Sequence, residues 1–178
     1  MAEESRQAYH RAEGAQTGWA EIYDEGIDLA RRSIALDPSN AEAHYSLFLN
    51  LGRKSERTGI SAQFRNVSEL KSELAKTIEL DPNHAHAWEA QGEMLLQLPR
   101  LMGGSRSEGE KALRRSQDLA PNWAKPPLRL AELHEKDGDT AKARAEASRA
   151  LELARKSGDT RVASDAEAIM NRLPPSAR

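Results

Sequence analysis

The segment Ile78-Glu79-Leu80-Asp81-Pro82-Asn83-His84-Ala85 has related copies at residues 34–41 and 117–124. In each copy a proline follows an apolar pattern of helical spacing. Proline lacks a backbone N–H and disfavours the α conformation of the preceding residue, so each copy ends one helix and precedes another. The copies recur roughly every 35 to 45 residues, which is typical of stacked helical hairpins. The sequence therefore predicts an array of such hairpins.

Apolar residues recur at helical spacing between these copies, as at Tyr23, Ile27 and Ala30. Strand-like alternation is not sustained anywhere, so we expect an all-α fold. The pattern predicts a single domain over residues 1–178, with four antiparallel helix pairs and a C-terminal capping helix. The helix pairs are expected at about 7–38, 41–82, 85–121 and 124–157, and the capping helix at 160–173.

Composition excludes several classes of function. The formal net charge is −2, from 26 basic and 28 acidic residues, so no strong field favours nucleic acid or an anionic membrane as a partner. There is no cysteine, which excludes disulfides and thiolate chemistry. No apolar run is long enough to span a bilayer. The acidic N-terminus is unlike a secretory signal, so we expect a cytoplasmic protein, or a periplasmic one if a signal peptide has been removed.

The third hairpin resembles a tetratricopeptide repeat (TPR), whose first helix follows the pattern W-x2-L-G-x2-Y. Here the pattern reads Trp88-x2-Gln91-Gly92-x2-Leu95, and the second helix continues with Gly109-x3-Leu113 and ends near Pro121. The resemblance covers about residues 7–173 and implies a right-handed superhelix. It also implies a non-enzymatic module that binds an extended peptide or a helix in its concave groove.

Two departures from the TPR pattern define the layout. The second hairpin carries extra residues around 52–59, and the third is stretched at 98–105. This layout is similar to the TPR-like domain of the regulator of microtubule dynamics family. The stretched segment is also similar to the periplasmic TPR component of TRAP transporters and to other bacterial TPR proteins. No motif specifies microtubule binding, so that activity is not carried over.

The TPR resemblance implies that the first helix of each hairpin lines the groove. The candidate groove residues are Arg11, Tyr45, Leu49, Arg53, His86, Glu89, Glu93, Lys125, Leu128 and Glu132. We expect Tyr45 and Leu49 to anchor a partner's apolar side chain; the alternative is that both belong to the core. Binding of a terminal carboxylate is disfavoured, because Ala15 replaces the asparagine that such binders use and Glu89 adds negative charge.

Other motifs favour structural roles. His84 and His86 diverge at the start of a helix without a third ligand, so we expect capping rather than metal binding. His44 and His134 occupy aromatic positions of the repeat and are predicted to pack. In the glycine-rich segment 103–111, Glu110 stands where a phosphate-binding loop has its lysine, so a lengthened turn is expected. Asn66 is predicted to cap a helix, and the basic run 53–65 is predicted to be a solvated loop, the alternative being a site for an acidic partner.

These observations predict a protein-binding scaffold that needs no cofactor or metal and does not act on nucleic acid or insert into a membrane. An accessory subunit of a transport system, which self-assembles or binds a small ligand, is the alternative. A homo-oligomer is compatible with both. No set of nucleophile, base and orienting residue supports an enzyme.

Overall fold

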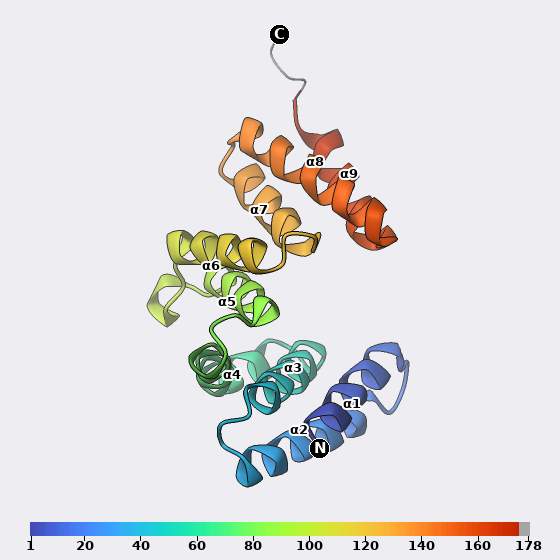
Figure 1. The fold of residues 1–178 in the computed structure, drawn as a ribbon, viewed down its shortest axis with the longest axis vertical. Helices are drawn as coiled ribbons and strands as arrows, with labels where there is room; N and C mark the ends of the chain where they lie inside the picture. The colour runs from blue at the N-terminus through green and yellow to red at the C-terminus, as the bar shows by residue number, and fades with distance from the viewer. Residues whose placement is uncertain (175–178) are drawn as a thin grey trace. The chain divides into compact units, whose positions relative to one another are not determined.

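The computed structural model describes residues 1–174 of the 178-residue chain (Figure 1). Within these residues the regular structure is α-helical, with one 3-10 helix and no strand, which confirms the all-α prediction. The chain forms two compact units, residues 1–83 and residues from 84 onwards. The boundary falls between the second and third predicted hairpins, and the single-domain arrangement stays a prediction. No helix of the described part is both long and apolar enough to cross a membrane.

The first unit consists of two helical hairpins. α1 (Ala2–Gly14) pairs with α2 (Trp19–Leu36), and α3 (Ala41–Thr58) pairs with α4 (Ile60–Leu80). α3 also packs against α1 and α2, so the two hairpins share one core. The fully buried side chains of this core include Ala8, Ala12, Tyr23, Ala30, Ala43 and Leu74.

The basic run 53–65 is helical, and the predicted solvated loop is wrong. α3 continues to Thr58, and only Gly59, with φ 120°, separates it from α4. The long α3 is held by ion pairs to the first hairpin, from Arg53 to Glu13 at 2.8 Å and from Lys54 to Asp24 at 2.5 Å. These contacts stabilise the C-terminal part of α3, whose glycine and run of charged residues alone would not predict a helix.

Asn66 lies inside α4, so its predicted role as a helix cap is also wrong. Its side chain donates a hydrogen bond of 2.8 Å to the Oγ of Ser55, which is buried in α3. The residue therefore joins the two helices of the second hairpin instead of starting one of them.

The second unit begins with a hairpin of α5 (Ala85–Gln97) and α6 (Arg106–Leu119), joined through the short 3-10 helix η1 (Arg100–Met102). A further hairpin follows, made of α7 (Lys125–Lys136) and α8 (Thr140–Ser157). α9 (Thr160–Arg172) packs against α7 and α8 and buries Val162, Ala166 and Ile169. α9 therefore closes the apolar core of the last hairpin, and its presence confirms the predicted capping helix.

Polar side chains fix where the helices begin. Asn40 accepts a hydrogen bond of 3.0 Å from the Ala43 backbone, and the imidazole of His84 accepts one of 3.1 Å from Ala87. Ser105, Asp139 and Asp159 cap α6, α8 and α9 in the same way. Such caps satisfy backbone N–H groups that have no partner within the helix. Two of them, His84 and Ser105, set the starts of α5 and α6, which border the cleft described next.

Candidate functional site

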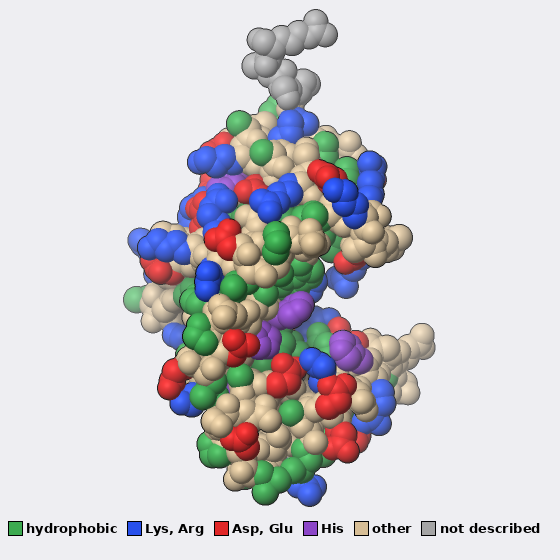
Figure 2. Space-filling view, in the orientation of Figure 1, with side chains coloured by type: hydrophobic (Ala, Val, Ile, Leu, Met, Phe, Trp, Pro, Cys, Tyr) green, Lys and Arg blue, Asp and Glu red, His purple; other side chains and the backbone are tan. Residues whose placement is uncertain are grey.

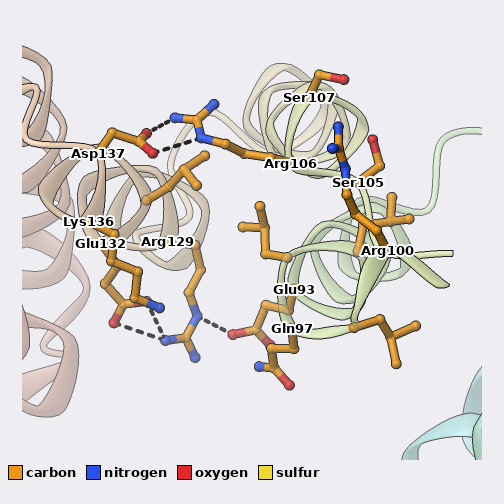
Figure 3. A pocket seen from close by; sticks show the side chains of 15 residues that line it. Glu93, Gln97, Arg100, Ser105, Arg106, Ser107, Arg129, Glu132, Lys136 and Asp137 are labelled. Carbon is orange, nitrogen blue, oxygen red and sulfur yellow. Dashed lines mark hydrogen bonds and ion pairs between the residues drawn. The ribbon is translucent and has the colours of Figure 1, made fainter. Parts of the chain in front are cut away.

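The second unit contains a cleft of about 680 Å³ (Figure 3). It is bounded by the end of α5, the connection through η1, the start of α6, and one face of α7. Its lining combines leucines with charged and hydroxyl side chains: Glu93, Leu95, Leu96, Gln97, Leu98, Arg100, Gly104, Ser105, Arg106, Ser107, Arg129, Glu132, Leu133, Lys136 and Asp137. A cleft of this size with an apolar floor and polar edges is typical of a binding site.

The floor depends on two glycines where α5 crosses α6. A Cβ at Gly92 would lie 2.7 Å from the Leu113 side chain, and a Cβ at Gly109 would lie 2.8 Å from that of Leu96. The missing side chains let the two helices approach closely. Leu96 thereby packs against the buried cluster that contains Leu113 and Leu133. The glycines of the repeat pattern thus place the leucines that line the cleft.

The stretched connection between α5 and α6 forms one edge of the cleft. Gly103 has φ 89°, a conformation that favours glycine, and a Cβ at Gly104 would overlap the Leu98 carbonyl oxygen at 1.8 Å. The backbone N–H of Ser105 donates a 2.9 Å hydrogen bond to the Leu95 carbonyl. The segment is therefore a tight, glycine-dependent turn, as predicted.

One ion pair joins α6 to α7 beside the cleft. The Nε of Arg106 donates a 2.8 Å hydrogen bond to Asp137, and the same guanidinium lies 3.4 Å from Glu110. Figure 3 shows this pair apart from the cluster around Arg129. It links the first turn of α6 to the residue that follows α7.

A second charged cluster joins α5 to α7 on the other side of the floor. Arg129 of α7 contacts Glu93 of α5 and donates hydrogen bonds of 3.1 and 3.0 Å to the carboxylate of Glu132 (Figure 3). Burial acts to lower the pKa of Arg129, but the carboxylates of Glu93 and Glu132 outweigh it and raise that pKa. The guanidinium therefore stays charged and holds the two helices together across the cleft.

Glu89 lies behind this cluster and is only 5% exposed. Its Oε1 is 3.9 Å from the Arg129 Nε, which is too far for a hydrogen bond, and the atom has no other hydrogen-bond partner among the described residues. Burial, reinforced by the nearby carboxylate of Glu93, raises the pKa of Glu89 to about 7. Its carboxyl group therefore changes charge near neutral pH.

The structure divides the ten predicted groove residues. Arg11, Tyr45, Leu49 and Arg53 lie in the first unit and the other six in the second, so their joint groove stays a prediction. Only Glu93 and Glu132 line the cleft. Lys125 is exposed at the start of α7, and His86 is exposed and packs edge-on against Trp123, with ring centres 4.1 Å apart.

Three of the predicted contact residues are buried instead. Leu128, 2% exposed, belongs to the core that α7 forms with α8 and α9, and Tyr45, 9% exposed, stacks on Phe48. Glu89 is enclosed by the ion cluster. Leu49 is half-buried. We expected Tyr45 and Leu49 to form an exposed apolar anchor. For Tyr45 this is wrong, because the side chain belongs to the core, as the alternative interpretation predicted.

Charged groove residues of the first unit are engaged within that unit. Arg11 forms an ion pair of 2.8 Å with Glu25, and Arg53 binds Glu13 and Glu56. His44, predicted to pack, is 7% exposed and contacts Glu73 at 2.6 Å, and His134 is 2% exposed. Within residues 1–174 no cluster of three His, Cys, Asp or Glu side chains is arranged to hold a metal ion.

The sequence reasoning missed most of the charged residues of the cleft. Arg100 and Arg106 flank the glycines of the stretched connection, Arg129 and Lys136 come from α7, and Asp137 directly follows it. The stretched connection itself was the available signal, since an insertion between paired helices must form a surface feature beside them. No sequence motif indicates that residues of α7 line the cleft.

Similar proteins support the same architecture. The thermophilic TPR protein TTC0263 from Thermus thermophilus is 16% identical, with a TM-score of 0.57 over 97% of this chain and 92% of that one. A MamA structure is 18% identical, with a TM-score of 0.56 over 97% and 87%. The structure MamA MSR-1 C2 is 24% identical, with a TM-score of 0.52 over 76% and 69%. These likenesses show a TPR-like fold. No curated protein matches the sequence.

A family model also matches the sequence. The match spans residues 1–98, slightly more than half of the chain, and carries the description "Regulator of microtubule dynamics protein 1-3". It covers both hairpins of the first unit and α5, and it confirms the resemblance to this family; the stretched segment after residue 98 lies outside the match. The chain therefore belongs to the regulator of microtubule dynamics protein 1-3 family.

Proposed function

We propose that this protein is a non-enzymatic interaction module that binds a segment of a partner protein in the cleft between α5, η1 and α7. TPR-like folds generally serve as protein-interaction scaffolds, and a preformed rigid site reduces the ordering that binding requires. The observation that carries the proposal is the cleft itself, about 680 Å³ with a leucine floor between two ion clusters.

The charged pairs around the floor support a binding role. The Arg106–Asp137 and Arg129–Glu93 contacts join α7 to both helices of the preceding hairpin. They hold the walls in place while Leu96 and Leu133 remain part of the lining. A partner's apolar side chain can therefore be buried there without rearranging the helices.

The test uses peptides of about twelve residues, selected for binding to the full chain from a random library. Gln97 is exposed at the end of α5 and lines the cleft, so a tryptophan there would fill it. We expect Gln97→Trp to weaken binding at least about tenfold, measured by fluorescence anisotropy. Gln16→Trp, at an exposed bend of the first unit, is the matched control and should bind normally.

Circular dichroism should show that both variants keep their helical content. Selected peptides that bind the Gln97→Trp variant as tightly as the original chain would place the binding surface elsewhere and overturn the proposal. Failure of the library to yield any binding peptide would also count against it.

A further inference from the structure

The charged side chains that line the cleft are not all paired with an opposite charge. Basic side chains outnumber carboxylates by one: Arg100, Arg106, Arg129 and Lys136 against Glu93, Glu132 and Asp137. Over the face drawn in Figure 2, by contrast, basic and acidic side chains are interspersed on both units. The preference of the cleft for a charged ligand depends on which of these side chains are already paired within it.

Each carboxylate of the lining already has a cationic partner. Asp137 accepts a hydrogen bond from Arg106, and Glu93 and Glu132 both contact Arg129. A basic ligand would have to compete with these guanidinium groups, which are fixed on α6 and α7. The acidic side chains of the cleft are therefore poor sites for a positively charged partner.

Arg100 and Lys136 are the exceptions. Neither side chain forms a hydrogen bond or ion pair with any residue of the described range 1–174, and both are exposed. Arg100 lies on η1 and Lys136 near the end of α7, and Figure 3 shows them on facing sides of the cleft. Each wall thus presents one cation without an ion-pair partner among residues 1–174, although Lys136 also lies in the field of the neighbouring Glu135 carboxylate.

The floor between these two cations is apolar. Leu133 is 6% exposed and packs with Leu113, Leu130 and Leu96 in one cluster. Leu95 and Leu98 add further apolar surface to the lining. Covering such a floor with an aliphatic side chain removes apolar surface from water and is favourable.

We propose that the segment bound in this cleft is acidic, with carboxylates that pair with Arg100 and Lys136 and an aliphatic side chain that covers the leucine floor. This inference rests on the proposed function and adds the chemistry of the partner. Two isolated cations do not make the extended basic surface that nucleic acid requires, so a protein segment is the occupant to which this chemistry points.

The experiment compares two synthetic peptides of about twelve residues. One has a central leucine flanked by aspartate and glutamate, and the other replaces every acidic residue with its amide. We expect the full chain to bind the acidic peptide about five- to tenfold more tightly, because two partly exposed charge pairs each contribute modestly. The difference should shrink as ionic strength rises.

Charge reversal locates the effect. The double variant Arg100→Glu and Lys136→Glu should lose the preference and bind the amide peptide at least as well as the acidic one. The control variant Arg149→Glu and Arg161→Glu changes the net charge equally at exposed positions of α8 and α9, outside the cleft. It should keep the preference, and circular dichroism should show unchanged helical content for both.

The outcomes separate the two proposals. If acidic and amide peptides bind equally and Gln97→Trp abolishes binding of both, the cleft is a binding site but its preference for acidic segments is wrong. If the acidic peptide binds equally to the Arg100→Glu and Lys136→Glu variant, the charge assignment is wrong. If Gln97→Trp also has no effect on that binding, both proposals fail.

Discussion

Gly26 in α2 lies directly against the side chain of Asn50 in α3, and a Cβ on the glycine would be 2.3 Å from the amide oxygen. Asn50 is completely buried, and its Nδ2 donates to the Ser5 and Ser46 carbonyl oxygens at 3.1 and 2.9 Å. Ser5 in turn donates a 2.7 Å hydrogen bond to the Gly26 carbonyl. This buried polar network joins α1, α2 and α3, although most of the surrounding core is apolar.

Gly26→Ala should therefore destabilise the protein, although alanine is the better helix former. The added methyl group must displace the buried Asn50 amide, and we expect a loss of about 1–3 kcal/mol in the free energy of unfolding. Urea denaturation monitored by circular dichroism measures it. Gly14→Ala, at an open position with no atom near the new methyl group, should be neutral or slightly stabilising. Equal effects of the two substitutions would contradict the packing explanation.

Arg57 connects the end of α3 to the end of α1. Its guanidinium donates hydrogen bonds to the carbonyl oxygens of Ala12 and Ala15 at 2.9 and 3.1 Å and lies 4.4 Å from the centre of the Trp19 ring. Lysine keeps the charge but cannot reproduce this planar arrangement. Arg57→Lys should lower the free energy of unfolding by about 1 kcal/mol.

The control for this change is Arg65→Lys, because Arg65 is exposed on α4 and forms no hydrogen bond or ion pair within the described residues. Thermal unfolding of the two variants should differ, with a lower midpoint only for Arg57→Lys. Identical midpoints would show that the contacts of Arg57 contribute nothing measurable.

Glu89 should make stability depend on pH. Its carboxyl has a pKa of about 7 in the folded chain, against the ordinary value of 4.5 expected after unfolding. Between these values the folded state binds a proton that the unfolded state releases, so stability falls as pH rises. The loss should begin above about pH 4.5, be complete above about pH 7, and amount to about 3 kcal/mol.

Glu89→Gln should remove this loss, because the amide stays neutral. Relative to the original chain, the variant should become more stable as pH rises from about 5 to about 8, as measured by urea unfolding at each pH. Glu21→Gln, at an exposed position, should show no such trend. A constant difference between Glu89→Gln and the original chain across this range would mean that Glu89 ionises at its ordinary pKa.

Gly104→Ala should change the cleft while leaving the helices in place. Its Cβ would overlap the Leu98 carbonyl oxygen, so the connection through η1 must move. We expect binding of the selected peptides to weaken at least about tenfold with helical content retained. Ser107→Ala, at an exposed position of the same lining, is the control and should bind normally. Normal binding by Gly104→Ala would show that this edge does not contribute to the site.

Local chemistry made much of the fold predictable. The prolines at 38, 82 and 121 lie in the connections between hairpins, and His84 caps α5 as expected. Such signals act within a few residues, so they can be interpreted without knowledge of the tertiary structure. The continuous α3 was missed because the contacts that support its basic end, such as Arg53 with Glu13, join residues far apart in sequence.

The candidate site was less predictable for the same reason. Arg129 and Glu93 meet only because α7 packs near α5, and nothing in either segment indicates the other. Leu128 was assigned to the exposed face, yet α8 and α9 cover it. The face of a helix that is buried depends on its neighbours, which the repeat pattern specifies only approximately.

The close crossing of α5 and α6 at Gly92 and Gly109 also has an evolutionary consequence. Every other amino acid carries at least a Cβ, so any substitution at either position introduces an atom too close to the side chain of Leu113 or Leu96. A larger residue at either position therefore requires a neighbouring leucine to shift or to be replaced by a smaller side chain. We expect the hairpin to diverge among descendants through paired substitutions at these sites, or not at all.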